Sequence, residues 1–160
     1  MRSSITIRPA LVEDSPAIMG LIRALAEFEK APEQVLVSEE DIVREGFGTD
    51  PIFKVHVAEE ANEVVGIALF YTGYSTWKGR MIYLDDLVVH QQYRGRGIGT
   101  QLLESVFEYA RQTKANLIKW QVLDWNEPAI EFYKKYPVQF GGEWLNCRIM
   151  TEALTTTHLS

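Results

Sequence analysis

The chain has 160 residues, of which 46% are hydrophobic and 24% are charged, and its formal net charge is -6. This composition is typical of one globular domain and excludes a disordered chain. The acidic balance argues against nucleic acid as the main partner and is compatible with a cationic substrate.

The single cysteine, Cys147, excludes an intrachain disulfide and a thiolate metal cluster, and we expect it to be a small buried hydrophobe. His56 and His90 have no metal-ligand partner at a useful spacing, so we expect no metal site. The amino terminus lacks the apolar core of a secretory signal, and no apolar run approaches the length of a membrane span. A cytoplasmic protein without a membrane partner is therefore expected.

The first elements in chain order are a strand and a helix. Residues 4–8 alternate like a short strand that Pro9 ends. Asp14, as the cap, and Pro16, in the first turn, then predict the start of a helix whose apolar stripe runs to Phe28.

An acidic segment, residues 27–40, follows this helix. Its ordinary interpretation is a solvated helix end and loop, and its functional interpretation is a rim that attracts a polyamine. Ser38 and Asp41 resemble a capping box that starts a second helix. Residues 53–59 and 64–74 then alternate as the two strands of a hairpin.

Residues 81–89 form an apolar strand interrupted by Asp85 and Asp86. Two adjacent acids in such a strand are costly unless they are solvated or paired. We expect Asp86 to point away from Asp85, to the opposite face, and to make a structural ion pair or cap.

The segment Arg94-Gly95-Arg96-Gly97-Ile98-Gly99 opens an amphipathic helix. The first N–H groups of a helix have no intrahelical acceptor, and glycines let a phosphate approach them, so this turn suits a diphosphate. The spacing matches neither a Walker A loop nor the dinucleotide fingerprint. A plain tight connection is the alternative.

Three elements complete the chain. Residues 117–123 predict a strand, and Asn126 caps a further helix with Pro128 in its first turn. Residues 144–150 predict a last strand, and the tail from about 152 to 160 is expected to fray. Neither a repeat nor a linker interrupts the chain, so residues 1–160 are expected to form a single domain.

The run from Arg94 to Thr100, after an apolar strand, resembles the acetyl-CoA-binding motif of the GNAT superfamily of N-acetyltransferases. Residues 83–86 (YLDD), 93–99 (YRGRGIG) and 125–134 (WNEPAIEFYK) are similar to the spermidine/spermine (diamine) and thialysine acetyltransferases. The resemblance extends from Ile7 to about Trp144. It implies an α/β (α+β) fold: one domain with a central mixed, mostly antiparallel sheet, a splayed middle strand and flanking helices.

The same resemblance implies the residues that bind acetyl-CoA, the cosubstrate. The diphosphate would lie on the glycine turn, the pantetheine along the backbone of the central strand, and further contacts would come from the second helix start. These residues are Leu87, Val88, Val89, Arg94, Gly95, Arg96, Gly97, Ile98, Gly99, Thr100, Asn126, Pro128, Ala129 and Tyr133.

Two residues are implied as catalytic. Tyr133 matches the tyrosine thought to protonate the departing thiolate, although the apolar pattern alone favours a core aromatic. Asp85 matches a substrate-side glutamate, the water-mediated base and amine anchor, and is one methylene shorter. Phe28, Glu29 and Trp77 match further amine-site positions.

The chain departs from the diamine enzymes at two places. Ser75 stands where they carry an acid, and the loop of residues 136–144 is shorter. Residues 124–126 (DWN) instead resemble the thialysine branch.

The resemblance implies an acetyl-CoA-dependent N-acetyltransferase that acts by direct attack in a ternary complex. Its substrate would be the primary amine of a diamine, a polyamine or a lysine-like amino acid such as thialysine. Another small amine or a protein amino group is the enzymatic alternative, and a non-catalytic CoA-binding sensor is the alternative of another class. A homodimer is implied by the resemblance alone.

Overall fold

The computed structural model describes residues 4–154. Within it the chain divides into two compact units, Met1–Gln121 and Val122–Ser160, here called the sheet unit and the C-terminal unit. Each is described by itself. In the described part of the chain, every helix falls short of the length and apolar character that crossing a bilayer requires.

The sheet unit contains five strands in one sheet, ordered as they occur along the chain. They are β1 (Thr6–Pro9), β2 (Lys54–Glu60), β3 (Glu63–Ser75), β4 (Gly79–Val89) and β5 (Leu117–Lys119). The first four pair antiparallel with their neighbours, whereas β5 lies parallel to β4. The expected mixed, mostly antiparallel sheet is therefore confirmed.

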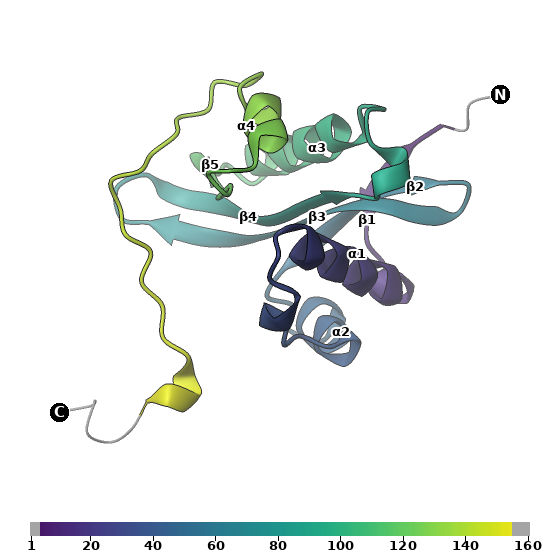
Figure 1. The fold of residues 1–160 in the computed structure, drawn as a ribbon, viewed down its shortest axis with the longest axis horizontal. Helices are drawn as coiled ribbons and strands as arrows, with labels where there is room; N and C mark the ends of the chain where they lie inside the picture. The colour runs from purple at the N-terminus through teal and green to yellow at the C-terminus, as the bar shows by residue number, and fades with distance from the viewer. Residues whose placement is uncertain (1–3, 155–160) are drawn as a thin grey trace. The chain divides into compact units, whose positions relative to one another are not determined.

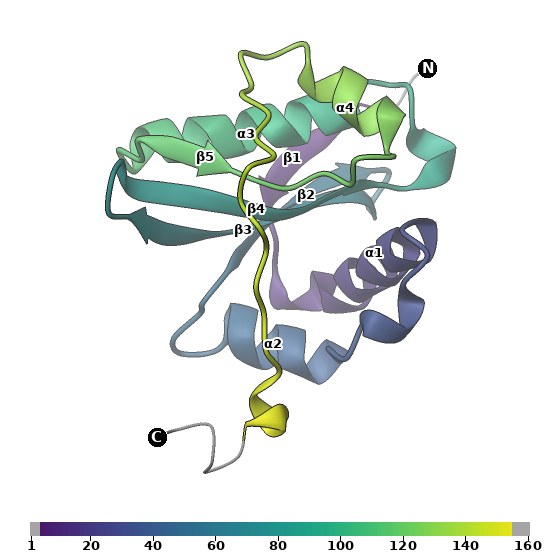
Figure 2. The same cartoon turned by 60° about the vertical axis from the view of Figure 1, so that its left-hand side comes forward.

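Helices cover both faces of this sheet. The helices α1 (Ser15–Phe28) and α2 (Glu39–Phe47) lie on one face, and α3 (Ile98–Gln112) lies on the other (Figure 1, Figure 2). The core under α1 and α2 consists of Ile18, Met19, Leu21, Ile42, Val55, Val57, Ile67, Leu69 and Val88. Leu102, Leu103 and Val106 are the α3 side chains that are fully removed from solvent. Burial of these apolar stripes is the main force that holds the layers together.

Local chemistry fixes where the elements begin. The Ser38 hydroxyl accepts from the Asp41 N–H, and the Asp41 carboxylate accepts from the Ser38 N–H, which confirms the capping box of α2. Asp14, predicted as the cap of α1, makes no capping hydrogen bond to that helix. The Asp14 carboxylate accepts from the Leu11 N–H and from Arg8 rather than from the first turn of α1.

The C-terminal unit contains α4 (Glu127–Tyr133), which begins where predicted, with the Asn126 side chain accepting from the Ala129 N–H at 3.4 Å. From residue 137 the chain continues without helix or strand to a short 3-10 turn, Thr151–Ala153. Of the tail expected to fray, residues 155–160 lie outside the described residues.

Three predictions near the end of the chain are wrong. The strand β5 ends at Lys119 rather than at residue 123, and residues 144–150 form no strand. Cys147 is exposed, and so are Trp144 and Leu145, at 82% and 91%. Alternating apolar residues make a strand only where a neighbouring strand completes the ladder, and no ladder includes residues 144–150 in the described part of the chain.

Candidate active site

The central feature of the sheet unit is a β-bulge in β4. Leu69 stands opposite Asp86 and Phe70 opposite Leu84, so Asp85 has no partner across the ladder. A bulge adds one residue to a strand and resets the alternation of its side chains. The acidic pair that interrupts the apolar strand therefore lies where the ladder is irregular.

Because of this bulge, Asp85 and Asp86 share one face of the sheet. Residues opposite each other in an antiparallel ladder lie on the same face, and Leu69, the partner of Asp86, belongs to the core under α1 and α2. Tyr83 pairs with Tyr71, which lies two residues beyond Leu69 on β3, so Tyr83 also faces this side. Asp85 follows Tyr83 by two residues, before the alternation resets, and faces the same way.

This arrangement corrects the prediction for Asp86. It does not lie on the face opposite Asp85, and within residues 4–154 it makes neither an ion pair nor a cap. Regular alternation predicts opposite faces for adjacent residues, and the inserted residue breaks that rule.

Glu29, just after the end of α1, joins the two aspartates. Burial raises the pKa of Glu29, and the nearby Asp85 raises it further. Burial, then Asp85 and Glu29, raise the pKa of Asp86 to about 7, and burial raises that of Asp85. Three neighbouring carboxylates, of which Asp85 raises the pKa of the other two, form a site that a bound cation stabilises. We call Glu29, Asp85 and Asp86 the acidic cluster.

Two tyrosines border the acidic cluster on the same face. Tyr71 and Tyr83 stack with ring centroids 5.3 Å apart. Burial raises the pKa of both hydroxyls, and Asp85 raises it further. We did not identify this pair from sequence, although the register of the β3–β4 hairpin places the two residues opposite each other.

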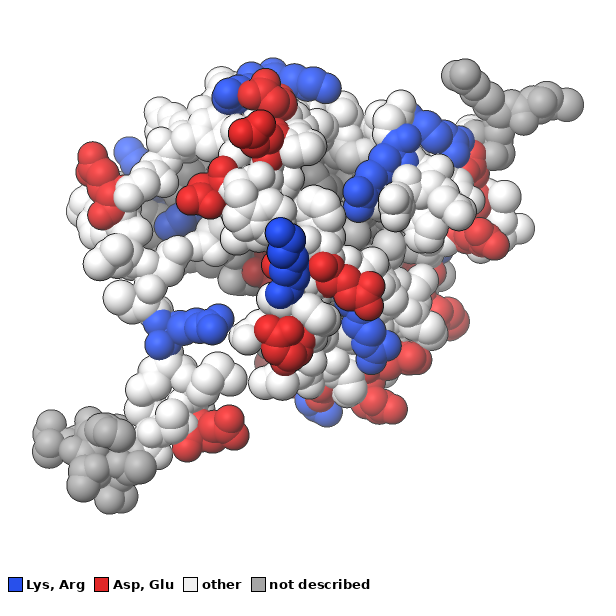
Figure 3. Space-filling view, in the orientation of Figure 1, with Lys and Arg blue, Asp and Glu red and all other residues white. Residues whose placement is uncertain are grey.

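Acidic side chains extend beyond the cluster. In Figure 3 several acidic side chains lie over the region of α1 and α2, with basic side chains among them. The acids that these helices and their connection contribute are Glu27, Glu29, Glu33, Glu39, Glu40, Asp41 and Glu45. This negative field favours the approach of a cation.

Along the edge of β4 that faces β5, the ladder covers only part of the strand. Its ladder with β5 includes only Met81, Ile82 and Tyr83, so in the described chain the β5-side edge has no ladder from Leu84 to Val89. The predicted contacts Leu87, Val88 and Val89 lie on this stretch. A strand edge without a ladder presents backbone N–H and C=O groups, to which an extended molecule can bond as an added strand does.

The glycine turn follows β4 at the start of α3. Gly95 and Gly97 have φ values of 77° and 79°, a region that strongly favours glycine. Within the described chain, no acceptor is found for the backbone N–H groups of residues 95–100. Together with the N-terminus of α3, these groups make the turn a site for an anion.

The two arginines of the turn have different surroundings. Arg94 donates from Nε to the Val89 carbonyl at 3.2 Å, and its guanidinium lies 5.7 Å from the centre of the Phe28 ring. Arg96 instead makes a bidentate ion pair with Glu60. Phe28, predicted for the amine site, therefore lies near the turn, next to Glu29 of the acidic cluster.

Trp77 and Ser75 lie in and beside the tight turn that joins β3 to β4. The Ser75 hydroxyl accepts from the backbone N–H groups of Trp77 and Lys78, so this side chain organises the turn. The Trp77 indole is 83% exposed. The β4 stretch from Gly79 to Asp85 is on the order of 20 Å long, so a single sheet unit does not bring Trp77 to the acidic cluster.

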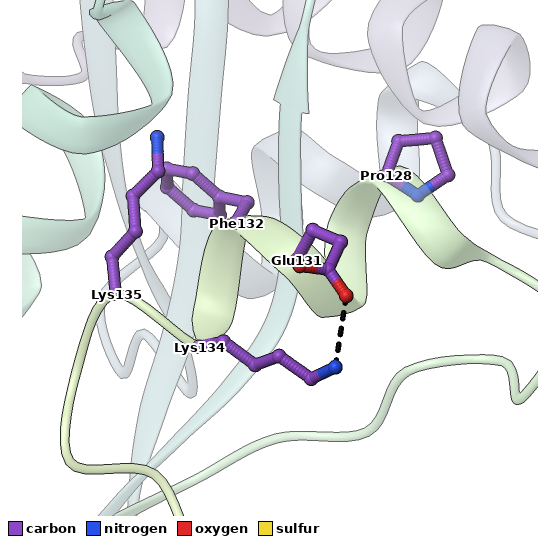
Figure 4. Close-up of a pocket in the computed structure, with 5 residues that line it drawn as sticks. All are labelled: Pro128, Glu131, Phe132, Lys134 and Lys135. Atoms are coloured by element: carbon purple, nitrogen blue, oxygen red, sulfur yellow. Dashed lines mark hydrogen bonds and ion pairs between the residues drawn. The ribbon is translucent and has the colours of Figure 1, made fainter.

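In the C-terminal unit, the remaining predicted residues lie on α4. The Ala129 N–H is bonded to the Asn126 cap, and Tyr133 is the last residue of the helix. An open hollow of about 510 Å³ runs along α4, lined by Pro128, Glu131, Phe132, Lys134 and Lys135 (Figure 4). Lys134 pairs with Glu131 at 2.8 Å, and Lys135 lies over the Phe132 ring. Pro128 is the predicted site residue that lines this hollow.

The sequence profile described as the acetyltransferase (GNAT) family matches residues 17–136. The chain belongs to the GNAT family. It is accordingly an N-acetyltransferase, as the names of its relatives indicate.

Two relatives illustrate the similarity in sequence. The chain is 42% identical to a thialysine N-epsilon-acetyltransferase of Mus musculus over 163 aligned positions, which cover 95% of this chain and 96% of that protein. It is 34% identical to the spermidine/spermine N(1)-acetyltransferase-like protein 1 of Homo sapiens, over 79% of this chain and 19% of that longer protein.

A solved structure illustrates the similarity in fold. An aminoglycoside N-acetyltransferase in complex with CoA superposes with a TM-score of 0.75, at 14% identity, over 93% of this chain and 97% of that one. This GNAT enzyme shares the fold of the chain and holds CoA, the product that remains of the donor after acetyl transfer. In residues 4–154 of the present chain, no group of three His, Cys, Asp or Glu side chains is arranged to hold a metal ion.

Proposed function

We propose that the chain transfers acetyl from acetyl-CoA to a primary amine of a small cationic substrate, by direct attack in a ternary complex. The observation that carries this proposal is the structure of β4. Its bulge turns two carboxylates to one face, its open edge presents backbone groups, and its end leads into an anion-binding turn. Amine, pantetheine and diphosphate would each find a suitable partner along one strand.

The donor would be bound mainly by backbone groups. The N–H groups of residues 95–100 and the Arg94 guanidinium suit the diphosphate, and the open edge at residues 87–89 suits the pantetheine. Asn126, Pro128, Ala129 and Tyr133 are proposed as further contacts from the resemblance alone. When bound, acetyl-CoA supplies the activated acetyl group.

The acidic cluster would bind and activate the amine. An alkylammonium has a pKa of about 10.4 and must lose a proton before its nitrogen can attack. Asp85 would take that proton, directly or through water, while Glu29 and Asp86 hold the cation. The amine nitrogen then bonds to the acetyl carbon, the carbon–sulfur bond breaks, and Tyr133 gives the departing thiolate its proton. The nitrogen loses its second proton in the same step, and that proton returns to Tyr133 through water.

The substrate class follows from charge and from the relatives. Three neighbouring carboxylates favour an ammonium group, and relatives at 40% to 42% identity are named for thialysine. A lysine-like amino acid such as thialysine is therefore the first substrate to test, followed by a diamine or polyamine. Another small amine or a protein amino group is the enzymatic alternative.

We further propose one N-acetyltransferase domain over residues 1–160, a homodimer and a cytoplasmic location. The family match extends from the sheet unit into the C-terminal unit, which supports one domain. The homodimer is proposed from the resemblance alone.

The deciding experiment measures CoA release from acetyl-CoA with thialysine, lysine, spermidine, putrescine and a peptide amine. We expect turnover on a small cationic amine that falls about a hundredfold in Tyr133→Phe and in Asp85→Ala. Tyr136→Phe removes an equivalent hydroxyl three residues away and serves as the matched control. Turnover on the peptide amine alone would favour the protein substrate, and CoA binding without turnover on any amine would favour the sensor.

A further inference from the structure

The ion pair between Arg96 and Glu60 joins the glycine turn to the β2–β3 hairpin. Arg96 donates from Nη1 and Nη2 to the two carboxylate oxygens of Glu60, the first bond being 3.1 Å long. The Glu60 side chain is 7% exposed and that of Arg96 is 38% exposed. A bidentate pair of this kind fixes direction as well as distance.

Both ends of the pair are themselves held. Glu60 is the last residue of β2, before the turn in which Ala61 and Asn62 have φ values of 50° and 66°, as in a tight two-residue hairpin. The Arg96 guanidinium also lies 5.3 Å from the centre of the Tyr93 ring. The residue between the two left-handed glycines is thus anchored to the sheet and to the turn before it.

From this geometry we infer that Arg96 is a positioning residue, which Glu60 holds in place, and not a ligand of the diphosphate. Gly95 and Gly97 let the turn adopt its conformation but also give the unfolded chain the most freedom to lose. The pair with Glu60 fixes the turn so that the N–H groups of residues 95–100 point to one anion. The inference rests on the proposed function, because it concerns how acetyl-CoA is bound.

The competing arrangement is that Arg96 leaves Glu60 and binds a phosphate when the donor arrives. The two arrangements predict opposite effects of Glu60→Gln. Removing a negative charge beside an anion site strengthens anion binding through simple electrostatics. If Glu60 instead positions the turn, the same change weakens binding.

The experiment titrates CoA into the protein by calorimetry and compares Glu60→Gln with Glu63→Gln. The control removes the same charge from the neighbouring strand end of the same hairpin, where no ion pair is found within residues 4–154. We expect Glu60→Gln to weaken CoA binding by about tenfold or more and Glu63→Gln to leave it unchanged or slightly stronger. CoA binding by Glu60→Gln as tight as that by Glu63→Gln would overturn the inference.

Two further measurements separate positioning from general damage. The KM for acetyl-CoA should rise in Glu60→Gln, while kcat and the KM for S-acetylpantetheine, which lacks the diphosphate, stay unchanged. The double variant Glu60→Gln/Arg96→Lys, which keeps the positive charge at position 96, should bind CoA no more weakly than Glu60→Gln, because the pair acts as one unit. An additional loss in the double variant would show that Arg96 binds the phosphate and would overturn the inference.

If Glu60→Gln folds poorly, a second variant, Arg96→Lys, tests the same inference. Arg96→Lys keeps the charge and loses the bidentate geometry, so it should also raise the KM for acetyl-CoA and leave that for S-acetylpantetheine unchanged. Equal KM values for acetyl-CoA in Arg96→Lys and in wild type would overturn the inference. Absence of CoA binding to the wild-type protein would instead overturn the proposed function, and the inference with it.

Discussion

The two halves of the candidate site belong to the same strand, but one consists of side-chain carboxylates and the other of backbone N–H groups. At the bulge of β4, side-chain carboxylates from Asp85, Asp86 and the adjoining Glu29 gather on one face. Beyond the end of β4, the glycine turn presents backbone N–H groups, and glycine supplies no side chain to bind anything. One half suits a cation and the other an anion, which are the charges of an amine and of a diphosphate.

Because carboxylates form one half and backbone groups the other, the two halves respond differently to pH and to substitution. The acidic cluster depends on charges that repel one another, so its occupancy and stability follow pH. The turn depends on backbone conformation, so it should be insensitive to pH near neutrality and sensitive to any residue with a Cβ atom. Substitutions that add a methyl group or remove a charge can therefore tell the two halves apart.

The largest expected effect on ligand binding is at the turn. Gly97 has a φ of 79°, and no atom lies within 4 Å of a Cβ added there. Gly97→Ala should therefore lose about 1–2 kcal/mol of stability through conformational strain alone. Because the strain also shifts the N–H groups, we expect CoA binding by calorimetry to weaken about tenfold.

The control for this prediction is the same substitution in α1. Gly20 lies inside the helix, with nothing within 4 Å of an added Cβ. Gly20→Ala should stabilise the protein, by up to about 1 kcal/mol, and leave CoA binding unchanged. Shifts of opposite sign in urea unfolding would support the conformational reason, whereas unchanged stability in Gly97→Ala would contradict it.

The contrast between the two halves also explains what the sequence could predict. A glycine pattern before an apolar stripe encodes backbone conformation directly, so the turn and the start of α3 at Ile98 were predicted correctly. The face occupied by Asp86 depends on the register of β4 against β3, and the bulge at Asp85 changes that register. The local sequence of a strand does not determine how it pairs with a strand that is distant along the chain.

The same reason accounts for the wrong predictions near the end of the chain, and it explains why the ion pair of Arg96 could not be foreseen. Residues 144–150 have the alternation of a strand but no ladder in the described structure, and Cys147 is exposed with them. Arg96 stands in a motif that suggests phosphate binding, and its partner Glu60 is 36 residues away in sequence. Local patterns gave the helix starts and the hairpin, while pairings across the chain needed the structure.

At the acidic cluster the expected effect is on stability, and it depends on pH. The pKa of Asp86 is raised from 3.8 to about 7, so the folded protein binds this proton more tightly than the unfolded chain does. The free energy of unfolding therefore falls as the pH rises between these two values. Asp86→Asn removes the charge, so its free energy of unfolding should exceed that of wild type by roughly 1–3 kcal/mol at pH 8 and by little at pH 4.

Urea unfolding of Asp86→Asn, of wild type and of the surface control Asp50→Asn across pH 4 to 8 tests this prediction. Asp50 is exposed, so Asp50→Asn should follow the wild-type curve. Parallel curves for Asp86→Asn and wild type would mean that Asp86 titrates normally. The acidic cluster would then not depend on pH in the way that separates it from the turn.

The smallest expected effect is at the turn between β3 and β4. Trp77→Ala removes an indole that is 83% exposed, so its free energy of unfolding should change by less than about 0.5 kcal/mol. Since one chain holds Trp77 on the order of 20 Å along β4 from Asp85, we expect the KM for the amine to stay within about twofold of wild type. Tyr74→Ala, another exposed aromatic of this hairpin, is the matched control.

An amine KM that rises in Trp77→Ala and not in Tyr74→Ala would mean that a single chain does not complete the amine-binding half of the site. The indole would then reach the amine from a second copy of the chain, and light scattering should find a dimer at the assay concentration. The cation half of the site would be shared between two chains, whereas the turn uses groups of one chain. An unchanged KM would leave both halves to a single β4, with the bulge alone responsible for gathering the carboxylates.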